Sequence, residues 1–214
     1  MPRYKAVLFD IDDTLLTTRE PKWRQHKMVA KQYYGIELTD DTLRQHWGKP
    51  FDELTAVLYQ NKGTAEERRT NFTRHELAFP KEYEPYAQEI IEALYATGIV
   101  LGLMTAMFWE GAKIDLTNLQ VPLEYFVVHQ GAEATKHHKP DGRVFEPALT
   151  KLKTLGITDK IVYVGEALSD YQAAKAAGLD FMGVTQGLIG QADFESAGAK
   201  VVFSNLAEIK DYII

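Results

Sequence analysis

The chain has 214 residues, of which 45% are hydrophobic and 25% are charged, values close to those of ordinary globular proteins. This length allows one or two domains with a substantial core. The chain contains no cysteine, which excludes disulfides, thiolate metal sites and cysteine nucleophiles. The net charge is -6, from 24 Lys and Arg against 30 Asp and Glu, and this balance argues against a nucleic-acid-binding protein.

The apolar segments are too short to cross a membrane. The longest of them, Ile99 to Thr105, falls far short of the ~20 residues that a spanning helix needs. The N-terminal segment predicts a strand and lacks the apolar core and the cleavage site of a signal peptide. We therefore expect a cytoplasmic protein with no membrane partner.

Short apolar runs alternate with segments of helical periodicity over most of the chain. Each run has the length of a strand, and apolar residues at consecutive positions are typical of strands buried on both faces of a parallel sheet. The alternation predicts an α/β fold with a doubly wound parallel sheet. The predicted strands are 6–9, 99–104, 125–128, 161–164, 181–184 and 201–203. The predicted helices between them are 86–97, 144–155 and 169–177, the last with Ser169 as its N-cap.

The region from residue 17 to residue 85 breaks this alternation. It contains no strand-like run, and its pattern predicts four helices, at 22–34, 40–47, 51–60 and 65–78. We interpret it as an all-helical insertion after the first strand. The predicted domains are therefore a core of residues 1–16 and 86–214 and a helical domain of residues 17–85.

Polar side chains follow several of the predicted strands, at the edge where an open α/β sheet binds its ligands. Asp10 and Asp12 follow the first strand, Thr105 follows the second, and Glu166 and Asp170 follow the fourth. Converging carboxylates repel each other, so such a site requires a divalent cation. Because all of its ligands are oxygens, Mg²⁺ is the natural choice.

The order of these segments resembles that of the haloacid dehalogenase-like superfamily. The segment from Phe9 to Leu15 is similar to the first motif of the family, Asp-x-Asp-x-Thr after a hydrophobic strand. Three further motifs follow in the family's order, at Leu103 to Thr105, Lys139 to Phe145, and Val164 to Gly178. The resemblance implies a Rossmann-like core with an inserted helical cap, in the branch that includes phosphoglycolate phosphatases and β-phosphoglucomutases.

The resemblance also implies Mg²⁺-dependent hydrolysis of a small phosphorylated metabolite. Asp10 would be the nucleophile that forms an aspartyl-phosphate, and Asp12 would be the general acid and base. Thr105 and Lys139 would bind the phosphoryl oxygens. The helical cap would close over the cleft, moving about hinges near residues 16–18 and 84–85, and would select the substrate. The implied Mg²⁺ ligands are Asp10, the Asp12 carbonyl, Glu166 and Asp170.

Three positions bear on the metal and on the substrate. Glu166 stands where the family usually has aspartate, and its extra methylene would shift the metal shell or require a bridging water. Ala106 replaces a common asparagine, which leaves its backbone N–H as a contact for substrate. Gly48, in Gly48-Lys49-Pro50, resembles a turn that lies near the substrate in related caps, and an ordinary break between helices explains it equally well.

Two other features have simpler structural explanations. Adjacent side chains such as His137 and His138 do not readily converge on one ion, so we expect them in a solvated loop. Asp170 would also stabilise the start of a helix through the helix dipole, a role compatible with metal support.

Three alternative functions remain open at this point. A phosphomutase has the same core residues but returns the phosphoryl group to a sugar. A dehalogenase is disfavoured because the departure of halide does not need the acid and base that Asp12 supplies. A non-catalytic binder of a phosphorylated ligand is supported only by the departures at Glu166 and Ala106. The sequence leaves open whether the chain is a monomer or a homodimer.

Overall fold

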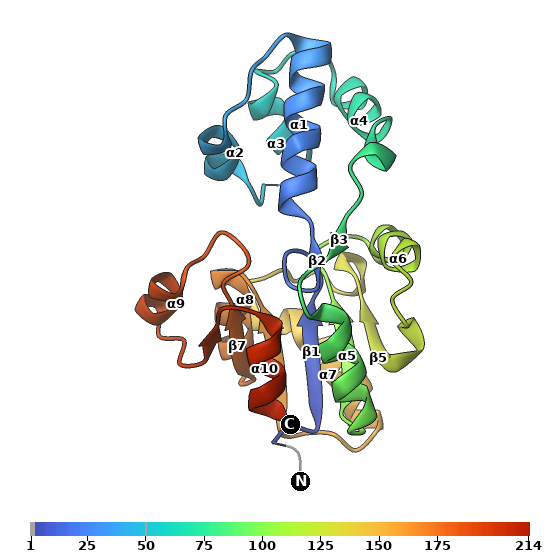
Figure 1. Ribbon diagram of the computed structural model, residues 1–214, viewed down its shortest axis with the longest axis vertical. Coiled ribbons are helices and arrows are strands. Elements are labelled where there is room, and N and C mark those ends of the chain that lie inside the picture. Colours follow the sequence, from blue (N-terminus) through green and yellow to red (C-terminus); the bar gives the residue numbers. More distant parts are fainter. Residues whose placement is uncertain (1–2, 50) are drawn as a thin grey trace. The chain divides into compact units, whose positions relative to one another are not determined.

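The computed structural model describes residues 3–49 and 51–214, and it divides the chain into two compact units (Figure 1). The core unit comprises residues 1–17 and 82–214, and the helical unit comprises residues 18–81. The helical unit is shorter than the predicted insertion of residues 17–85. No helix in the described parts of the chain combines the length and the apolar character that a membrane span requires.

A parallel sheet of six strands forms the centre of the core unit, in the order β5-β4-β1-β6-β7-β8. The chain starts in the middle of the sheet, adds strands on one side and then continues on the other, which confirms the predicted doubly wound fold. The strands are β1 (Ala6–Asp10), β4 (Val100–Met104), β5 (Phe126–Gln130), β6 (Ile161–Gly165), β7 (Asp180–Val184) and β8 (Val202–Phe203).

Helices cover both faces of this sheet (Figure 1). Alternate residues of β1 point to opposite faces: Val7 and Phe9 belong to one buried cluster, and Ala6 and Leu8 belong to the other. The first cluster is completed by residues of α5 (Ala87–Ala96), α6 (Trp109–Asn118) and α10 (Leu206–Ile213). The second is completed by residues of η4 (Gly142–Phe145), α7 (Glu146–Thr154) and α8 (Leu168–Ala176). The remaining helices of the unit are α9 (Gln191–Ala197), η2 (Leu123–Tyr125) and η3 (Ala132–Ala134).

The start of α8 corrects one prediction. The helix begins at Leu168 with Ala167 as its N-cap, so Ser169 lies inside the first turn and is not the cap. The carboxylate of Asp170 caps this end instead, because its Oδ2 accepts the backbone N–H groups of Glu166 at 3.1 Å and of Ala167 at 3.0 Å. A side chain at the third helical position thus takes the role predicted for the serine.

Two short strands at the junction correct the prediction that residues 17–85 contain no strand. β2 (Leu16–Thr17) pairs with β3 (Glu82–Tyr83) in an antiparallel ribbon, with Leu16 opposite Tyr83 and Thr17 opposite Glu82. Strands of two residues are too short to give a periodic signal. The ribbon brings the two ends of the core unit together where the chain leaves it and returns.

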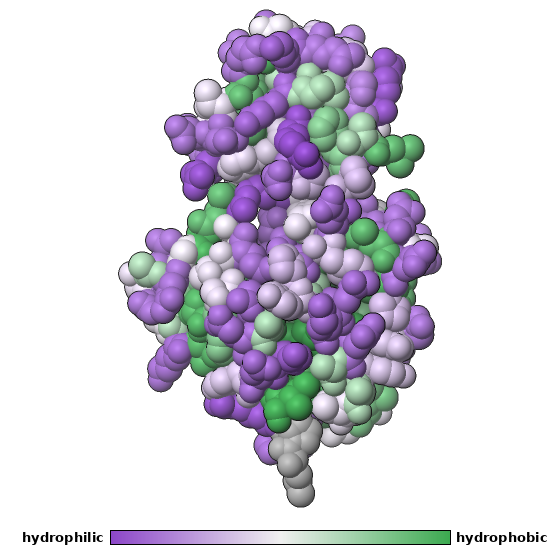
Figure 2. Space-filling view, in the orientation of Figure 1, coloured by the Kyte–Doolittle hydropathy of each residue, from purple (hydrophilic) through white to green (hydrophobic). Residues whose placement is uncertain are grey.

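The helical unit contains the four predicted helices, with the last one shorter than expected. They are α1 (Arg19–Tyr34), α2 (Asp40–His46), α3 (Phe51–Leu58) and α4 (Ala65–Thr73), and a short 3₁₀ helix, η1 (Glu76–Ala78), follows. A capping box between Thr64 and Glu67 fixes the start of α4. The face of the unit seen in Figure 2 carries mainly hydrophilic residues. Its interior includes Leu43, Leu58, Tyr59 and Phe72.

Candidate active site

The candidate site lies in the core unit, at the carboxyl ends of three neighbouring strands. Asp10 is the last residue of β1, which lies between β4 and β6 in the sheet. Thr105 follows β4 directly, and Glu166 follows β6 directly. Because parallel strands end at the same edge, the pairing of β1 with both neighbours brings these three positions to one place.

Lys139 forms ion pairs with two buried carboxylates. Its Nζ lies 2.5 Å from Oδ1 of Asp10 and 2.6 Å from Oδ1 of Asp170. Asp10 and Asp170 are only 6% and 2% exposed. The structure therefore brings three of the sequence-predicted site residues into direct contact, out of reach of bulk water.

Tyr163 belongs to this cluster, and the sequence reasoning missed it. Its hydroxyl lies 3.3 Å from Oδ1 of Asp10 and 3.4 Å from Oδ1 of Asp170. In the sequence it stands inside the apolar run of β6, where a tyrosine looks like an ordinary core residue. One signal in the sequence could have found it. A buried tyrosine hydroxyl needs a hydrogen-bond partner, and the carboxylates near the end of β6 are candidates for that partner.

Asp12 and Thr105 form a second contact across the site. The Thr105 hydroxyl donates to Oδ2 of Asp12 at 3.0 Å, and its oxygen accepts the Met107 N–H at 3.0 Å. The Thr105 N–H donates to the Gln130 carbonyl at 3.0 Å, which fixes the backbone at the end of β4. This hydrogen bond holds the Asp12 carboxylate beside the end of β4.

A small cavity of about 30 Å³ opens beside Thr105 and Lys139. Ala106, whose side chain is exposed, and His137 also line it. The imidazole Nδ1 of His137 lies 3.5 Å from Oδ2 of Asp141. His137 is half-buried and His138 is exposed, as expected for residues of a surface loop. Asp10 and Asp12 are not among the residues that line this cavity.

Burial and neighbouring carboxylates disfavour the charged forms of two carboxyl groups of the site. Burial raises the pKa of Asp10 to about 7, with Lys139 opposing the rise and Asp170 adding to it. Burial raises the pKa of Glu166 to about 9, and repulsion from Asp10 and Asp170 adds to the effect. Burial alone would lower the pKa of Lys139, but the two aspartates outweigh burial and hold its pKa well above the usual value.

This donor set fits a hard divalent cation, because a cation beside these buried carboxyls would favour their charged forms and oppose the rise in pKa that burial and neighbouring carboxylates cause. Within residues 3–49 and 51–214, no group of three or more His, Cys, Asp or Glu side chains already stands in a metal-ligating arrangement. The fit therefore rests on the chemistry of the donors, and the four implied ligands remain a prediction.

Asp170 has contacts that favour a positioning role. Its Oδ1 meets Lys139 and its Oδ2 accepts two backbone N–H groups at the start of α8. A Cβ on Gly165 would lie 2.6 Å from Oδ2 of Asp170, so the glycine makes room for this close approach. Asp170 thus holds Lys139 and the loop that carries Glu166.

The remaining predicted site residue, Gly48, lies in the helical unit. It follows α2 with a φ of +89°, a backbone conformation that favours glycine. Pro50 of the same turn lies outside the described residues. The proximity of Gly48 to a substrate remains a prediction.

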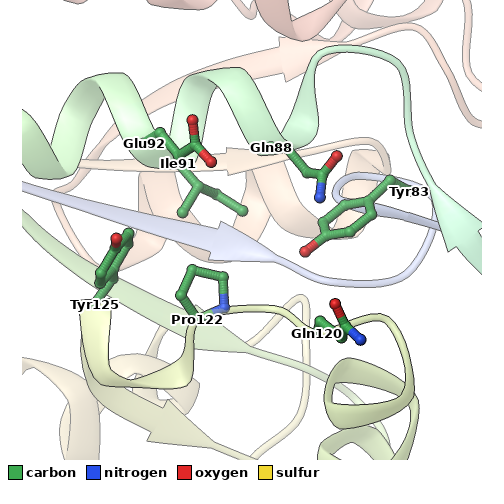
Figure 3. Close-up of a pocket in the computed structure, with 7 residues that line it drawn as sticks. All are labelled: Tyr83, Gln88, Ile91, Glu92, Gln120, Pro122 and Tyr125. Carbon is green, nitrogen blue, oxygen red and sulfur yellow. The ribbon is translucent and has the colours of Figure 1, made fainter.

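A larger cavity of about 180 Å³ lies elsewhere in the core unit, between α5 and the segment before β5 (Figure 3). Figure 3 shows the Tyr83 hydroxyl and the Gln88 amide beside it. Among the described residues that line it, Glu92 alone is charged, so they offer no positive group to a phosphorylated ligand. The lining residues are Tyr83, Gln88, Ile91, Glu92, Gln120, Pro122 and Tyr125.

Comparison with known proteins finds the same family in sequence and in structure. Residues 7–184 match the family described as haloacid dehalogenase-like hydrolase. A putative pyrophosphatase PpaX of Clostridium perfringens is 30% identical over 192 residues, which cover 84% of this chain and 83% of that protein. A phosphorylated carbohydrates phosphatase of Thermotoga maritima is 28% identical over 187 residues, or 82% of each chain. The crystal structure of a putative β-phosphoglucomutase from Thermotoga maritima superposes with a TM-score of 0.83, at 26% identity and 97% coverage of both chains.

Proposed function

The chain belongs to the haloacid dehalogenase-like hydrolase family, and on that basis we propose that it is a Mg²⁺-dependent phosphatase of small phosphomonoesters that works through an aspartyl-phosphate. The observation that carries the proposal is the buried Asp10 carboxylate at the end of β1, with Lys139 at 2.5 Å. A buried carboxylate at a strand end, beside a lysine whose positive charge attracts an anionic phosphoryl group, supports a nucleophilic role for Asp10. The similar protein named as a phosphorylated carbohydrates phosphatase supports this substrate class.

In the first step, an oxygen of Asp10 attacks phosphorus, and the bond between phosphorus and the leaving oxygen breaks. Asp12, in its protonated form, gives its proton to the leaving oxygen, so that an alcohol departs. The Thr105 hydroxyl donates to Oδ2 of Asp12 at 3.0 Å and so restrains the side chain of the acid. Lys139 and the N–H of Ala106 bind phosphoryl oxygens as negative charge builds up on them.

In the second step, Asp12 acts as a base. The carboxylate left after the first step takes a proton from a water molecule, and the resulting hydroxide attacks phosphorus. The bond between Asp10 and phosphorus breaks, inorganic phosphate leaves, and Asp10 recovers its carboxylate. Asp12 is then protonated again, which returns the site to its starting state.

Mg²⁺, when bound, would neutralise the charge between nucleophile and substrate and polarise a phosphoryl oxygen. Asp10, the Asp12 carbonyl, Glu166 and Asp170 are the residues that would hold it. Because the Asp170 oxygens already contact Lys139 and the start of α8, Asp170 would act through a water molecule. Lys139 stays charged, because both of its carboxylate partners favour its ammonium form and raise its pKa. It therefore provides a fixed positive charge at the phosphoryl position.

The helical unit, residues 18–81, is proposed to act as the cap that selects the substrate. It is inserted shortly after the nucleophile loop and is joined to the core through the ribbon of β2 and β3. Binding of the substrate would be coupled to closure of the cap, which excludes water from the reacting groups.

The proposal is tested with a panel of phosphorylated metabolites and an aryl phosphate, each with Mg²⁺ and with a chelator. Release of inorganic phosphate that depends on Mg²⁺ is expected, with one compound class favoured. A protein that isomerises a hexose phosphate and releases little phosphate would be a phosphomutase, the activity for which the structural relative from Thermotoga maritima is named. A protein that binds a panel compound without turnover would be a non-catalytic binder.

A further inference from the structure

We propose that Gly187 is a positioning residue for Glu166: its missing side chain makes the space that the longer carboxylate of Glu166 occupies. The inference rests on the proposed function, because it concerns the residue that is proposed to bind Mg²⁺ from the end of β6. Gly187 lies beyond residues 7–184, the part of the chain that matches the family, so no motif of that match assigns it a role.

The contact is direct. A Cβ on Gly187 would lie 1.7 Å from Oε2 of Glu166, 2.7 Å from its Cδ and 3.2 Å from its Cβ. The first two distances are shorter than any real contact of a Cβ atom allows. The carboxylate of Glu166 therefore rests against the backbone of Gly187, in space that any other residue would fill with its side chain.

The backbone itself does not require glycine at this position. The glycines with positive φ in the described chain are at other positions, so alanine is compatible with the conformation of residue 187. The close approach of another side chain is the remaining reason for a glycine here. Since the atom that would be displaced is the end of a flexible side chain, an added methyl group would move the carboxylate and leave the fold intact.

The loop that carries Gly187 is fixed at both sides of the glycine. The Thr185 N–H donates to the Phe203 carbonyl at 3.1 Å, and the Gln186 amide donates to Oε2 of Glu84 at 2.8 Å. On the other side, the Gly190 N–H donates to Oδ2 of Asp193 at 3.0 Å. The loop therefore cannot easily retreat from a methyl group at residue 187, and the carboxylate of Glu166 is the part that moves.

The extra methylene of Glu166 explains why the two residues are matched. An aspartate at this position would be shorter by one carbon–carbon bond, about 1.5 Å, and its carboxylate would stop short of Gly187. The longer side chain must place its carboxylate somewhere beside the ends of β6 and β7, and the missing Cβ of Gly187 provides that place. Glu166 and Gly187 thus form one unit, in which the loop after β7 sets the direction of the carboxylate.

A double-mutant cycle of Gly187→Ala and Glu166→Asp tests the inference. In the wild-type background, G187A should weaken Mg²⁺ binding in calorimetry by about tenfold or more and lower kcat/KM in parallel. In the E166D background, G187A should change both much less, because aspartate lacks the two atoms that lie within 2.7 Å and keeps only the Cβ contact at 3.2 Å. The matched control is Gly190→Ala in the same loop, whose Cβ would meet its nearest neighbour at an ordinary 3.6 Å.

A second arm separates this inference from the proposed function. Unfolding midpoints measured with a chelator should fall more when G187A is made in the wild-type background than in the E166D background, whatever the reaction is. If the wild-type protein binds no Mg²⁺ and turns over without it, the proposed metal fails, and the midpoints decide the inference alone. Equal effects of G187A in both backgrounds, in binding and in midpoints, would overturn the role of Gly187.

Discussion

The core unit and the helical unit bury polar side chains in different ways. The core buries opposite charges in direct contact, Lys139 with Asp10 and Asp170, at one edge of its sheet. The helical unit instead buries polar groups on hydrogen-bond partners of its own. The Gln25 amide donates to the Phe72 carbonyl at 2.8 Å and accepts from the Lys22 ammonium at 3.4 Å. Nδ1 of His26 lies 2.8 Å from the Tyr59 hydroxyl, and the buried Arg68 guanidinium donates to the Gly63 carbonyl at 2.6 Å.

This difference indicates that the buried polar groups have a different role in each unit. Burying a charged pair costs desolvation that the attraction does not reliably repay, so stability alone does not explain the cluster in the core. Buried polar groups that form hydrogen bonds to the surrounding helices cost less than a buried cluster of opposite charges, and they orient the helices. The core therefore gives up stability to hold reactive groups, whereas the polar interior of the helical unit serves packing. Each prediction below would break or sharpen this division.

The largest effect is expected from Asp10→Asn, which keeps the shape of the side chain and removes its charge. We expect kcat/KM for an aryl phosphate to fall by at least ~10³-fold, because asparagine cannot form the acyl-phosphate. The fold should persist, since removing one carboxylate also relieves the repulsion that adds to the effect of burial on the pKa of Glu166. Steady-state kinetics and circular dichroism provide the two measurements.

The control for this variant is Asp159→Asn, which breaks the exposed ion pair between Asp159 and Lys5. Surface pairs contribute little, so its turnover should match that of the wild type. Wild-type turnover in the Asp10 variant would exclude the aspartyl-phosphate and leave the buried charges of the core without a chemical purpose.

Thr105→Val should have the next largest effect. Valine keeps the volume but removes the hydroxyl that donates to Asp12 and accepts from Met107. We expect kcat to fall ~10²-fold, comparable to the loss of one transition-state hydrogen-bond donor. Thr154→Val, at an exposed hydroxyl that donates to the Lys151 carbonyl, is the matched control and should leave kcat unchanged. Equal kinetics for the two variants would remove Thr105 from the site.

Removal of the helical unit should change selectivity more than chemistry. Thr17 and Glu82 pair directly across the ribbon, so a two-residue Asn-Gly turn can replace residues 18–81. The remaining core has its own hydrophobic clusters and should fold. We expect it to hydrolyse an aryl phosphate while its preference among natural substrates falls about tenfold or more.

An unchanged ranking of substrates in this shortened protein would place specificity in the loops of the core. Loss of folding in the shortened protein, seen by circular dichroism, would show that the two units depend on each other for stability. Either result would break the division between a chemical core and a selecting helical unit.

The sequence predicted the sheet and the main site residues for the same physical reason. Strands buried on both faces leave long apolar runs, and the polar residues that end them, such as Asp10 and Thr105, stand out by contrast. Tyr163 was missed because its ring belongs to the apolar run and only its hydroxyl reaches the carboxylates. Gly187 was missed because its role depends on a contact with Glu166 across the sheet edge, which no local pattern records.

The exact ends of helices and the shortest strands could not be predicted from the sequence either. Ser169 has the residue type of an N-cap, yet α8 begins one residue earlier and Asp170 caps it through its side chain. The ribbon of β2 and β3 depends on a contact between residues 16–17 and residues 82–83, far apart in the chain. Both features are decided by tertiary contacts, whereas periodicity reports only the middle of long elements.

The effect with the least bearing on catalysis concerns the acid stability of the helical unit. Burial lowers the pKa of His26 from 6.5 to about 3, and the nearby Lys22 ammonium adds to the effect. The unfolded chain therefore binds a proton more readily than the folded one. The contribution of His26 to stability is complete above pH 6.5 and is lost as the pH falls, by about 1.4 kcal/mol per pH unit until the folded pKa near 3 is reached.

Denaturant unfolding between pH 7 and pH 4 measures this slope. A Trp109→Phe background leaves Trp23 and Trp47, both in the helical unit, as the fluorescent reporters. His26→Gln should be less stable at pH 7, because it loses the hydrogen bond to Tyr59, and its stability should depend less on pH than that of the parent. His138→Gln, at an exposed histidine, should keep the slope of the parent. An equal slope in the His26 variant would mean that this unit, too, depends on charged groups for its response to acid, and the contrast with the core would disappear.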